Sequence, residues 1–180
     1  MSLSRIPFVA VLGALAGCAS APTVPTAPAV DLGRFMGDWY VIANIPTALE
    51  KTAHNAIETY ERTSDTRIAT TFRFNDGAFD GPLKTYNPVG FVRDDPSNAV
   101  WGMRFIWPIK AEYVIAWVDP DYSETIIARS KRDYVWIMAR TPQIEASRYA
   151  SLVERAVEMG YERYRIRRVP QQSLAERAVK

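Results

Sequence analysis

The chain has 180 residues, of which 48% are hydrophobic and 12% aromatic, so it has ample apolar material for the core of one domain. The formal net charge is only +2 and the basic residues are scattered, which argues against an electrostatic nucleic-acid binder. The single histidine excludes a multi-histidine metal site, and the single cysteine excludes an intrachain disulfide.

Residues 1–17 are predicted to be a lipoprotein signal peptide. One positive charge, Arg5, precedes an uncharged apolar run from Ile6 to Ala16, which is short for a membrane-spanning helix and typical of a secretory signal. The run ends in LAGC, which resembles a bacterial lipobox. Cleavage is therefore expected just before Cys18, which would then be acylated, for example with palmitate. The alternative is an ordinary signal peptide in which Cys18 is incidental.

Residues 18–30 contain the lipidated cysteine and a tether broken regularly by Pro22, Pro25 and Pro28. Such a small, polar, Pro-rich stretch is expected to be extended and to lie outside the core.

From Trp39 to Arg140, short apolar runs alternate with clusters of Asp, Asn, Gly, Pro and Ser at hairpin spacing, which predicts antiparallel strands. One longer connection, residues 45–54, has the length of a lid-like loop. The eight expected strands cover residues 39–44, 55–62, 67–75, 84–92, 99–107, 113–118, 124–129 and 134–140.

A helix is predicted after the strands, with Thr141 as its cap, Pro142 in its first turn and Gly160 as its terminator. Residues 161–169 are expected to form a ninth strand, and residues 171–180 a loose tail. Eight antiparallel strands followed by one helix favour a closed up-and-down barrel, whose interior holds either side chains or one small ligand.

Three motifs in order resemble those of the lipocalin family. The first is Gly37-Asp38-Trp39-Tyr40, and the second and third are DPDYSETIIA at 119–128 and DYVWIMARTP at 133–142. The segment YASLVERAVEMGY, at 149–161, is similar to the helix that follows the barrel in bacterial lipocalins. The resemblance spans residues 31–170 and implies an all-β fold: an eight-stranded antiparallel barrel with a C-terminal helix packed outside and a short final strand.

The resemblance also assigns a barrel-closing role to Gly37, Trp39 and Arg140. A short helix, LGRFM at 32–36, is expected to cover one end, with Trp39 above it inside the barrel. The Arg140 guanidinium is expected to stack on the indole and bind carbonyls of this helix, while Gly37 lets the backbone bend into the strand. The alternative is that Trp39 contacts the ligand directly.

Side-chain alternation along the strands predicts an aromatic interior with soft methionine sites, suited to an acyl chain. Trp101 and Trp107 share the inward parity of the fifth strand, and either Glu58 or Glu61 faces inward. The alternative is a barrel filled by its own side chains. The expected ligand-binding residues are Tyr60, Phe72, Met103, Phe105, Tyr113, Ile115, Trp117, Trp136 and Met138.

We expect no catalytic residues, no metal and no cofactor. His54 is interpreted as a solvated loop residue, although one histidine suffices for haem iron. The pairs Asp94-Asp95 and Asp119/Asp121 are interpreted as turn residues, with calcium as the alternative. With Cys18 lipidated, the domain has no thiol nucleophile.

The resulting hypothesis is a non-enzymatic protein that binds and carries a fatty acid, a lysophospholipid or a similar small hydrophobic ligand, with its polar head near the open end. As in bacterial lipocalins, we expect a lipid anchor in the outer membrane, with the domain facing the periplasm. The expected partners are the ligand and the membrane, with no nucleic acid; a homodimer is left open. Two other functions stay open: a lipid-modifying enzyme, and a filled envelope barrel that acts through its surface.

Overall fold

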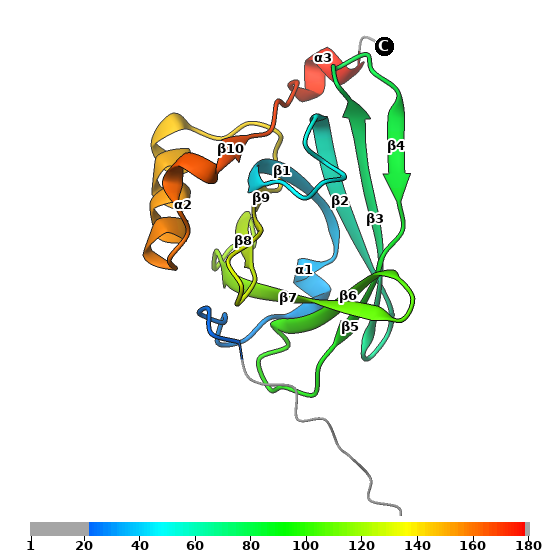
Figure 1. Ribbon diagram of the computed structural model, residues 1–180, viewed down its shortest axis with the longest axis vertical. Helices are drawn as coiled ribbons and strands as arrows, with labels where there is room; N and C mark the ends of the chain where they lie inside the picture. Colours follow the sequence, from blue (N-terminus) through cyan, green and yellow to red (C-terminus); the bar gives the residue numbers. More distant parts are fainter. Residues whose placement is uncertain (1–21, 179–180) are drawn as a thin grey trace, which may run out of the picture.

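Alternating buried and exposed side chains build a closed antiparallel barrel in the computed structural model, which describes residues 22–178 (Figure 1). The predicted signal peptide and Cys18 lie outside the described residues. Strands that follow one another in the chain pair side by side, except that β4 and β5 both pair with β3, and β1 pairs with β9 to close the wall. The strands are β1 Gly37–Ile45, β2 Ala53–Ser64, β3 Arg67–Asp76, β4 Leu83–Tyr86, β5 Val89–Val92, β6 Val100–Ile106, β7 Ile109–Val118, β8 Glu124–Ala128 and β9 Val135–Ala139.

The fourth predicted strand is interrupted rather than continuous. Asn87 and Pro88 separate β4 from β5, because a proline has no N–H to donate to a neighbouring strand. Both pieces pair with β3, and β5 also pairs with β6. With β4 and β5 counted as one strand, the barrel has the eight antiparallel strands that the sequence predicts.

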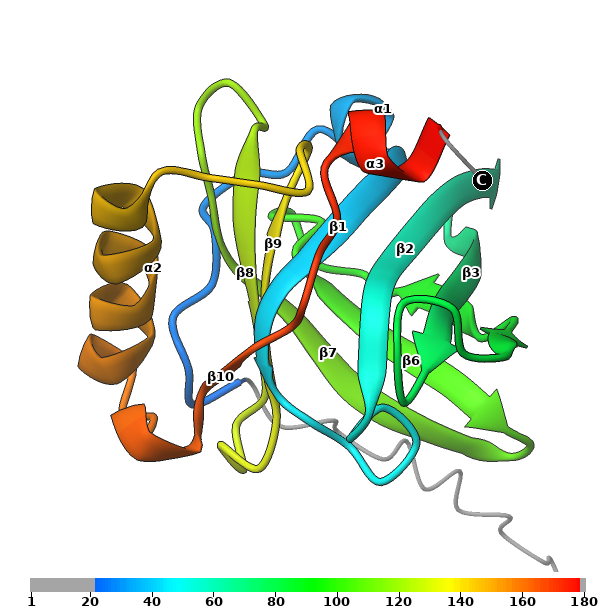
Figure 2. The same cartoon turned by 90° about the horizontal axis from the view of Figure 1, so that it is seen from above.

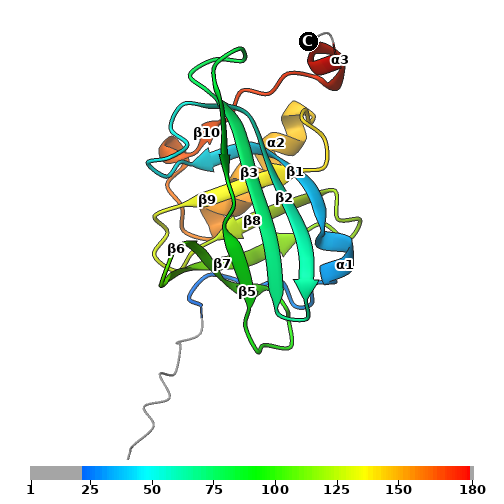
Figure 3. The same ribbon diagram turned by 90° about the vertical axis from the view of Figure 1, so that its right-hand side faces the viewer.

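The two ends of the barrel differ. The short helix α1, Leu32–Phe35, covers one end, which we call the closed end (Figure 3). The Asp31 carboxylate caps this helix by accepting from the N–H groups of Gly33 and Arg34, at 2.8 and 3.2 Å. The opposite, open end is formed by the β1–β2 loop (46–52), the β3–β4 loop (77–82), the β6–β7 turn (107–108) and the β8–β9 turn (129–134) (Figure 2).

The described part of the predicted tether, residues 22–30, packs on the barrel rather than lying free. Val24, Ala27 and Val30 are buried, and Ala27 N donates to the Ile115 carbonyl at 3.0 Å. Their spacing of three residues matches the three residues per turn of polyproline II, so a Pro-rich extended segment places all three on one side. The prediction that this stretch stays outside the core is therefore wrong for these residues.

Helix α2, Ala146–Glu158, packs against the outside of the barrel through Leu152, Val153 and Ala156. It starts later than predicted, because the Thr141 hydroxyl donates to the Gln143 carbonyl instead of capping a helix. The predicted terminator, Gly160, follows the helix with φ +94°, a value that favours glycine. Among the described residues, no helix combines the length and the hydropathy needed to cross a membrane.

The C-terminal segment completes the wall between β1 and β2. These strands pair directly only from Gly37↔Tyr60 to Tyr40↔Ile57. Closer to the open end, the short strand β10, Arg167–Arg168, pairs with β1, and Asn55 N donates to the Pro170 carbonyl at 2.8 Å. Gln171 Nε2 then donates to the Val41 and Ala56 carbonyls, at 2.7 and 2.9 Å.

Two C-terminal predictions need correction. Only β10 is a strand within residues 161–169, because the 3₁₀ helix η1, Arg163–Arg165, occupies the middle of the predicted ninth strand. The predicted loose tail is ordered as far as the structure describes it, and residues 174–178 form helix α3, Leu174–Ala178.

Candidate functional site

The half of the barrel next to α1 is filled by closely packed aromatic side chains, whose rings meet at tilted or edge-on angles. The rings of Phe35 and Trp39 lie 5.1 Å apart, and Tyr60 and Trp101 lie 5.4 and 5.7 Å from Phe35. Trp39 Nε1 donates to the Phe35 carbonyl at 2.8 Å, so the buried indole N–H has a partner. All four side chains are at most 1% exposed, and none of them lines the cavity in the other half.

Arg140 holds α1 against the end of β1. Its guanidinium carbon lies 3.8 Å from the Trp39 ring centroid, in a cation–π arrangement. Nη2 donates to the Arg34 carbonyl at 2.7 Å, and Nη1 donates to the Asp38 carbonyl at 2.8 Å. Gly37, at φ +92°, turns the chain from α1 into β1. The stacked geometry that the family resemblance implies for these side chains is present.

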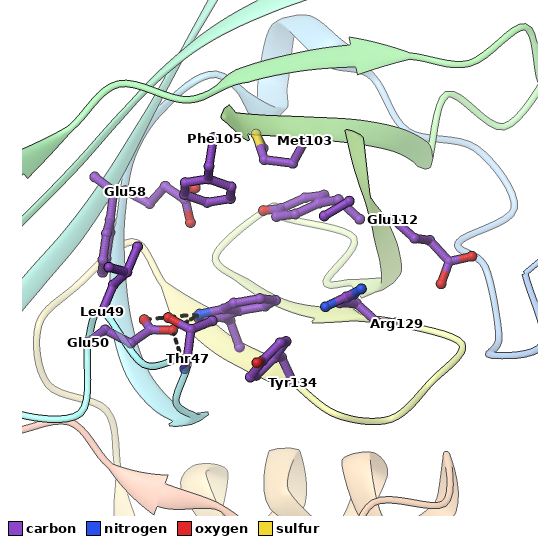
Figure 4. Close-up of a pocket in the computed structure, with 13 residues that line it drawn as sticks. Thr47, Leu49, Glu50, Glu58, Met103, Phe105, Glu112, Arg129 and Tyr134 are labelled. Carbon is purple, nitrogen blue, oxygen red and sulfur yellow. Dashed lines mark hydrogen bonds between the residues drawn. The ribbon is translucent and has the colours of Figure 1, made fainter. Parts of the chain in front are cut away.

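A cavity of about 160 Å³ occupies the other half and opens at the open end (Figure 4). Its walls are mainly apolar, with three carboxyl groups and one guanidinium among them. The lining residues are Thr47, Leu49, Glu50, Glu58, Phe72, Met103, Phe105, Ala111, Glu112, Tyr113, Arg129, Tyr134 and Trp136.

Five of the nine predicted ligand-binding residues line this cavity: Phe72, Met103, Phe105, Tyr113 and Trp136. Tyr60, Ile115 and Met138 point inward but belong to the packed interior and do not reach the cavity. Strand alternation therefore identified the inward face correctly at these eight positions, but it did not separate the filled half from the hollow half.

Trp117 lies outside the barrel, so its predicted inward orientation is wrong. The pairing of β7 with β8 shifts register between Ile115 and Trp117, and the extra residue reverses the alternation. Trp117 instead packs in the cluster between the barrel and α2, with the Arg155 guanidinium 4.7 Å from a ring centroid.

Trp107 also departs from the predicted inward parity. It is 78% exposed in the β6–β7 turn, beyond a register shift between Met103 and Ile106. Phe105, within the same shift, is half exposed at the rim of the cavity.

Sequence reasoning missed the lining residues from loops. The β1–β2 loop supplies Thr47, Leu49 and Glu50, and its length was the only signal that it could cover an opening. Trp136 Nε1 donates to both carboxylate oxygens of Glu50 at 3.2 Å, and Thr47 N donates to one of them at 2.9 Å. Burial raises the pKa of the Glu50 carboxyl above its ordinary value, while these hydrogen bonds oppose that rise.

Glu58 is the inward-facing carboxyl of β2, whereas Glu61 is exposed. Only 6% of Glu58 is exposed, and burial raises the pKa of its carboxyl to about 8. A hydrogen bond from Tyr60 lowers this pKa, and the neighbouring charge of Glu50 raises it further. Glu58 is therefore mostly protonated at neutral pH.

The hydroxyl groups of Tyr60 and Tyr113 form a hydrogen bond below the cavity. Burial raises the pKa of both phenols well above the ordinary value, so both stay protonated. Together with Glu58 they form a polar floor beneath the apolar walls.

The opposite rim is held together by the β8–β9 turn. Ser130 Oγ donates to Glu112 at 2.9 Å, and Arg129 forms an ion pair with Asp133 at 3.1 Å. Arg129 Nε is buried without a hydrogen-bond partner. The only cationic side chain of the cavity lining is thus already paired with a carboxylate.

The remaining candidate residues lie outside the cavity. His54 Nδ1 lies 3.0 Å from the Thr52 carbonyl, and its ring packs edge-on against Phe79. Asp95 and Asp119 accept hydrogen bonds from Ser97 and Ser123, as turn residues do. In the part of the chain that the structure describes, no group of three or more His, Cys, Asp or Glu residues is placed to hold a metal ion.

Two curated relatives cover most of the chain. Temperature-induced lipocalin-1 of Arabidopsis thaliana is 30% identical over 150 residues, which cover 79% of this chain and 80% of the relative. The outer membrane lipoprotein Blc of Citrobacter freundii is 28% identical over 173 residues, which cover 87% of this chain and 92% of the relative.

Two solved structures have the same fold. Lobster apocrustacyanin A1 is similar with a TM-score of 0.62 at 14% identity, over 83% of this chain and 91% of that one. Insecticyanin of the tobacco hornworm Manduca sexta also has a TM-score of 0.62, at 15% identity, over 87% of this chain and 88% of that one.

The family assignment rests on a match across most of the sequence. A family model described as a lipocalin-like domain matches residues 30–171. This range contains the three motifs, the barrel and α2, and it confirms the resemblance inferred from the motifs. The chain belongs to the lipocalin family.

Proposed function

We propose that the protein binds and carries a fatty acid, a lysophospholipid or a similar lipid at the bacterial cell envelope. Lipocalins bind small hydrophobic ligands, and the observation that carries this proposal is the apolar cavity open at one end only. Binding would be driven by burial of apolar ligand surface, which contributes about 25 cal/mol per Å².

The size of the cavity supports a slender ligand. Its volume of about 160 Å³ lies below the roughly 300–1,000 Å³ of pockets that enclose drug-sized molecules. One apolar chain fits this space, and the rest of the amphiphile would extend outward past the half-exposed side chains of Leu49 and Phe105.

The start of the described chain supports an envelope location with the open end toward the membrane. Thr23 N donates to Ser130 Oγ at 2.9 Å, and Ser130 belongs to the turn at the open end. Cys18 precedes Pro22 by four residues, which span at most about 14 Å. Acylation of Cys18, as in the outer-membrane lipoproteins that the Blc relatives are named for, would hold this end against the bilayer.

An exposed apolar tip supports the same orientation. We give this name to Ile106, Trp107 and Ile109, which are 73, 78 and 68% exposed on the β6–β7 hairpin. Arg104 and Lys110 flank the tip, with their cationic groups over the Phe91 ring. Tryptophan beside basic residues suits the boundary between water and lipid headgroups. A ligand would then pass between bilayer and cavity without crossing open water.

The protonation states of the floor favour binding over catalysis. A catalytic nucleophile needs an adjacent base, but the hydroxyls of Tyr60 and Tyr113 donate and accept only between themselves and Glu58. Both phenols are protonated at neutral pH, so neither is poised to attack a substrate. The presence of a cavity likewise argues against a fully filled barrel that acts only through its surface.

Titration of the chain from residue 19 onward with a fluorescent fatty acid tests the proposal, with tryptophan quenching as the readout. We expect saturable binding with one ligand per barrel. Absence of saturable binding for fatty acids, lysophospholipids and neutral lipids alike would contradict the carrier function.

A further inference from the structure

Carboxyl groups outnumber cationic groups around the cavity. Three carboxyl groups, Glu50, Glu58 and Glu112, line it, and its one guanidinium, Arg129, is paired with Asp133 at 3.1 Å. None of the ion pairs within residues 22–178 includes any of the three glutamates.

Two of the three carboxyl groups are occupied by the protein. Glu50 accepts hydrogen bonds from Trp136 and Thr47, and Glu112 accepts from Ser130. In Figure 4, Glu112 points away from the centre of the cavity, whereas the Glu58 carboxyl lies beside the Phe105 ring and faces inward. Glu58 is thus the carboxyl group of the floor that a ligand can reach.

A buried carboxylate needs a cation or several hydrogen-bond donors to be stable, and the barrel gives Glu58 only the Tyr60 hydroxyl. The protonated, neutral form of Glu58 is therefore favoured in the unliganded barrel. A ligand cation brought to the floor would supply the missing counter-charge, and the rings of Tyr113 and Trp136, stacked 6.3 Å apart, would add cation–π attraction.

We propose that the cavity selects amphiphiles with an ammonium head group, which enters first and forms an ion pair with Glu58 at the floor, while the alkyl chain leads out past Leu49 and Phe105. This proposal rests on the proposed function and narrows its ligand class. It also reverses the expected direction of insertion, which placed the polar head at the open end. As Glu58 deprotonates toward pH 8, a carboxylate head would meet its negative charge and is disfavoured at the floor, so a fatty acid would enter with its alkyl chain first.

Binding of the ammonium is coupled to release of a proton. The step is R–NH₃⁺ plus protonated Glu58, giving the R–NH₃⁺ carboxylate pair and H⁺. Affinity should therefore rise by up to about tenfold per pH unit below the pKa of Glu58 and level off above about 8. The other titratable or charged groups facing Glu58 or the cavity are Glu50, Tyr60, Tyr113, Glu112 and Arg129.

Calorimetric titration of the chain from residue 19 onward with decylamine, decan-1-ol and decanoate tests the proposal, because the three probes share one chain length. At pH 8 we expect decylamine to bind at least about tenfold more tightly than decanoate. Titrations in buffers of different ionisation enthalpy should show proton release with decylamine at pH 7 and none with decan-1-ol.

The matched variants are Glu58→Gln and Glu61→Gln, two glutamates of the same strand of which only the first faces the cavity. Glu58→Gln should abolish the decylamine preference and the proton release while decan-1-ol still binds, which also shows that the variant is folded. Glu61→Gln should behave as the wild type. Equal binding of decylamine and decanoate, unaffected by Glu58→Gln, would overturn the proposal and leave the carrier function standing. If none of the three probes binds, both proposals fail.

Discussion

The two ends of this barrel use similar residues for opposite purposes. At the closed end, Trp39 and Arg140 are aromatic and cationic groups with all their main donors occupied by the protein itself. In the half toward the open end, Trp107 is exposed at the rim and Glu58, on the cavity floor, lacks a cation. The comparison teaches that residue type alone does not distinguish the packed end of such a barrel from the end with the cavity. The two ends differ in whether their polar atoms already have partners within the protein.

Arg140→Ala should give the largest effect, a loss of about 3 kcal/mol in the free energy of unfolding. The variant removes charge-assisted hydrogen bonds to the carbonyls of Arg34 and Asp38 and the contact with the Trp39 ring. Urea denaturation measures this loss. Arg62→Ala is the control, because it removes only exposed contacts, an ion pair with Asp65 and a hydrogen bond to the Ser64 carbonyl, and should cost less than about 1 kcal/mol. Equal losses in the two variants would contradict the special role of the closed end.

Glu58→Gln should change how stability depends on pH. The folded-state pKa of Glu58, about 8, exceeds its unfolded value, so the native state binds more protons between those values. Wild-type stability should therefore fall as the pH rises from about 5 to 8, at no more than about 1.4 kcal/mol per pH unit. Because the interior relaxes around a charge, we expect a total near 2 kcal/mol. Urea unfolding at several pH values should show a flatter dependence in the variant; parallel curves would exclude the raised pKa.

Trp107→Ser should weaken binding of the anchorless chain to anionic phospholipid vesicles by about tenfold, since a large apolar side chain is withdrawn from the bilayer boundary. Vesicle co-sedimentation measures the effect. Leu174→Ser is the control: Leu174 is also exposed, but it lies on α3, away from the β6–β7 turn (Figures 1 and 2). A loss of equal size in both variants would show that the apolar tip is not the membrane contact.

Trp136→Phe should have the smallest effect. It keeps an aromatic wall but removes the N–H that holds Glu50 and the β1–β2 loop. We expect a loss of about 1 kcal/mol in stability and a faster exchange of backbone amides in residues 46–52. Unchanged exchange in this loop would mean that the Trp136 hydrogen bonds do not hold it over the cavity.

The sequence predicted the strands of the barrel better than the residues that line its cavity. Alternation works for Phe72, Met103, Tyr113 and Trp136 because each lies in a stretch of its strand that is paired without a register shift. It fails for Trp117 because one extra residue in β7 reverses every later side chain, and apolar patterning does not reveal a bulge. The role of Glu50 in the cavity could not be predicted for another reason. Its partner Trp136 is 86 residues away in the sequence, and such pairs form only when the barrel closes.

The C-terminal segment affects when the barrel can finish folding. The wall between β1 and β2 depends on Pro170 and Gln171, which hydrogen-bond to both strands. The free edge of β1, the first barrel strand in the chain, is therefore filled only after residues 167–171 have been synthesised. Such long-range closure slows folding and leaves an open strand edge in the meantime.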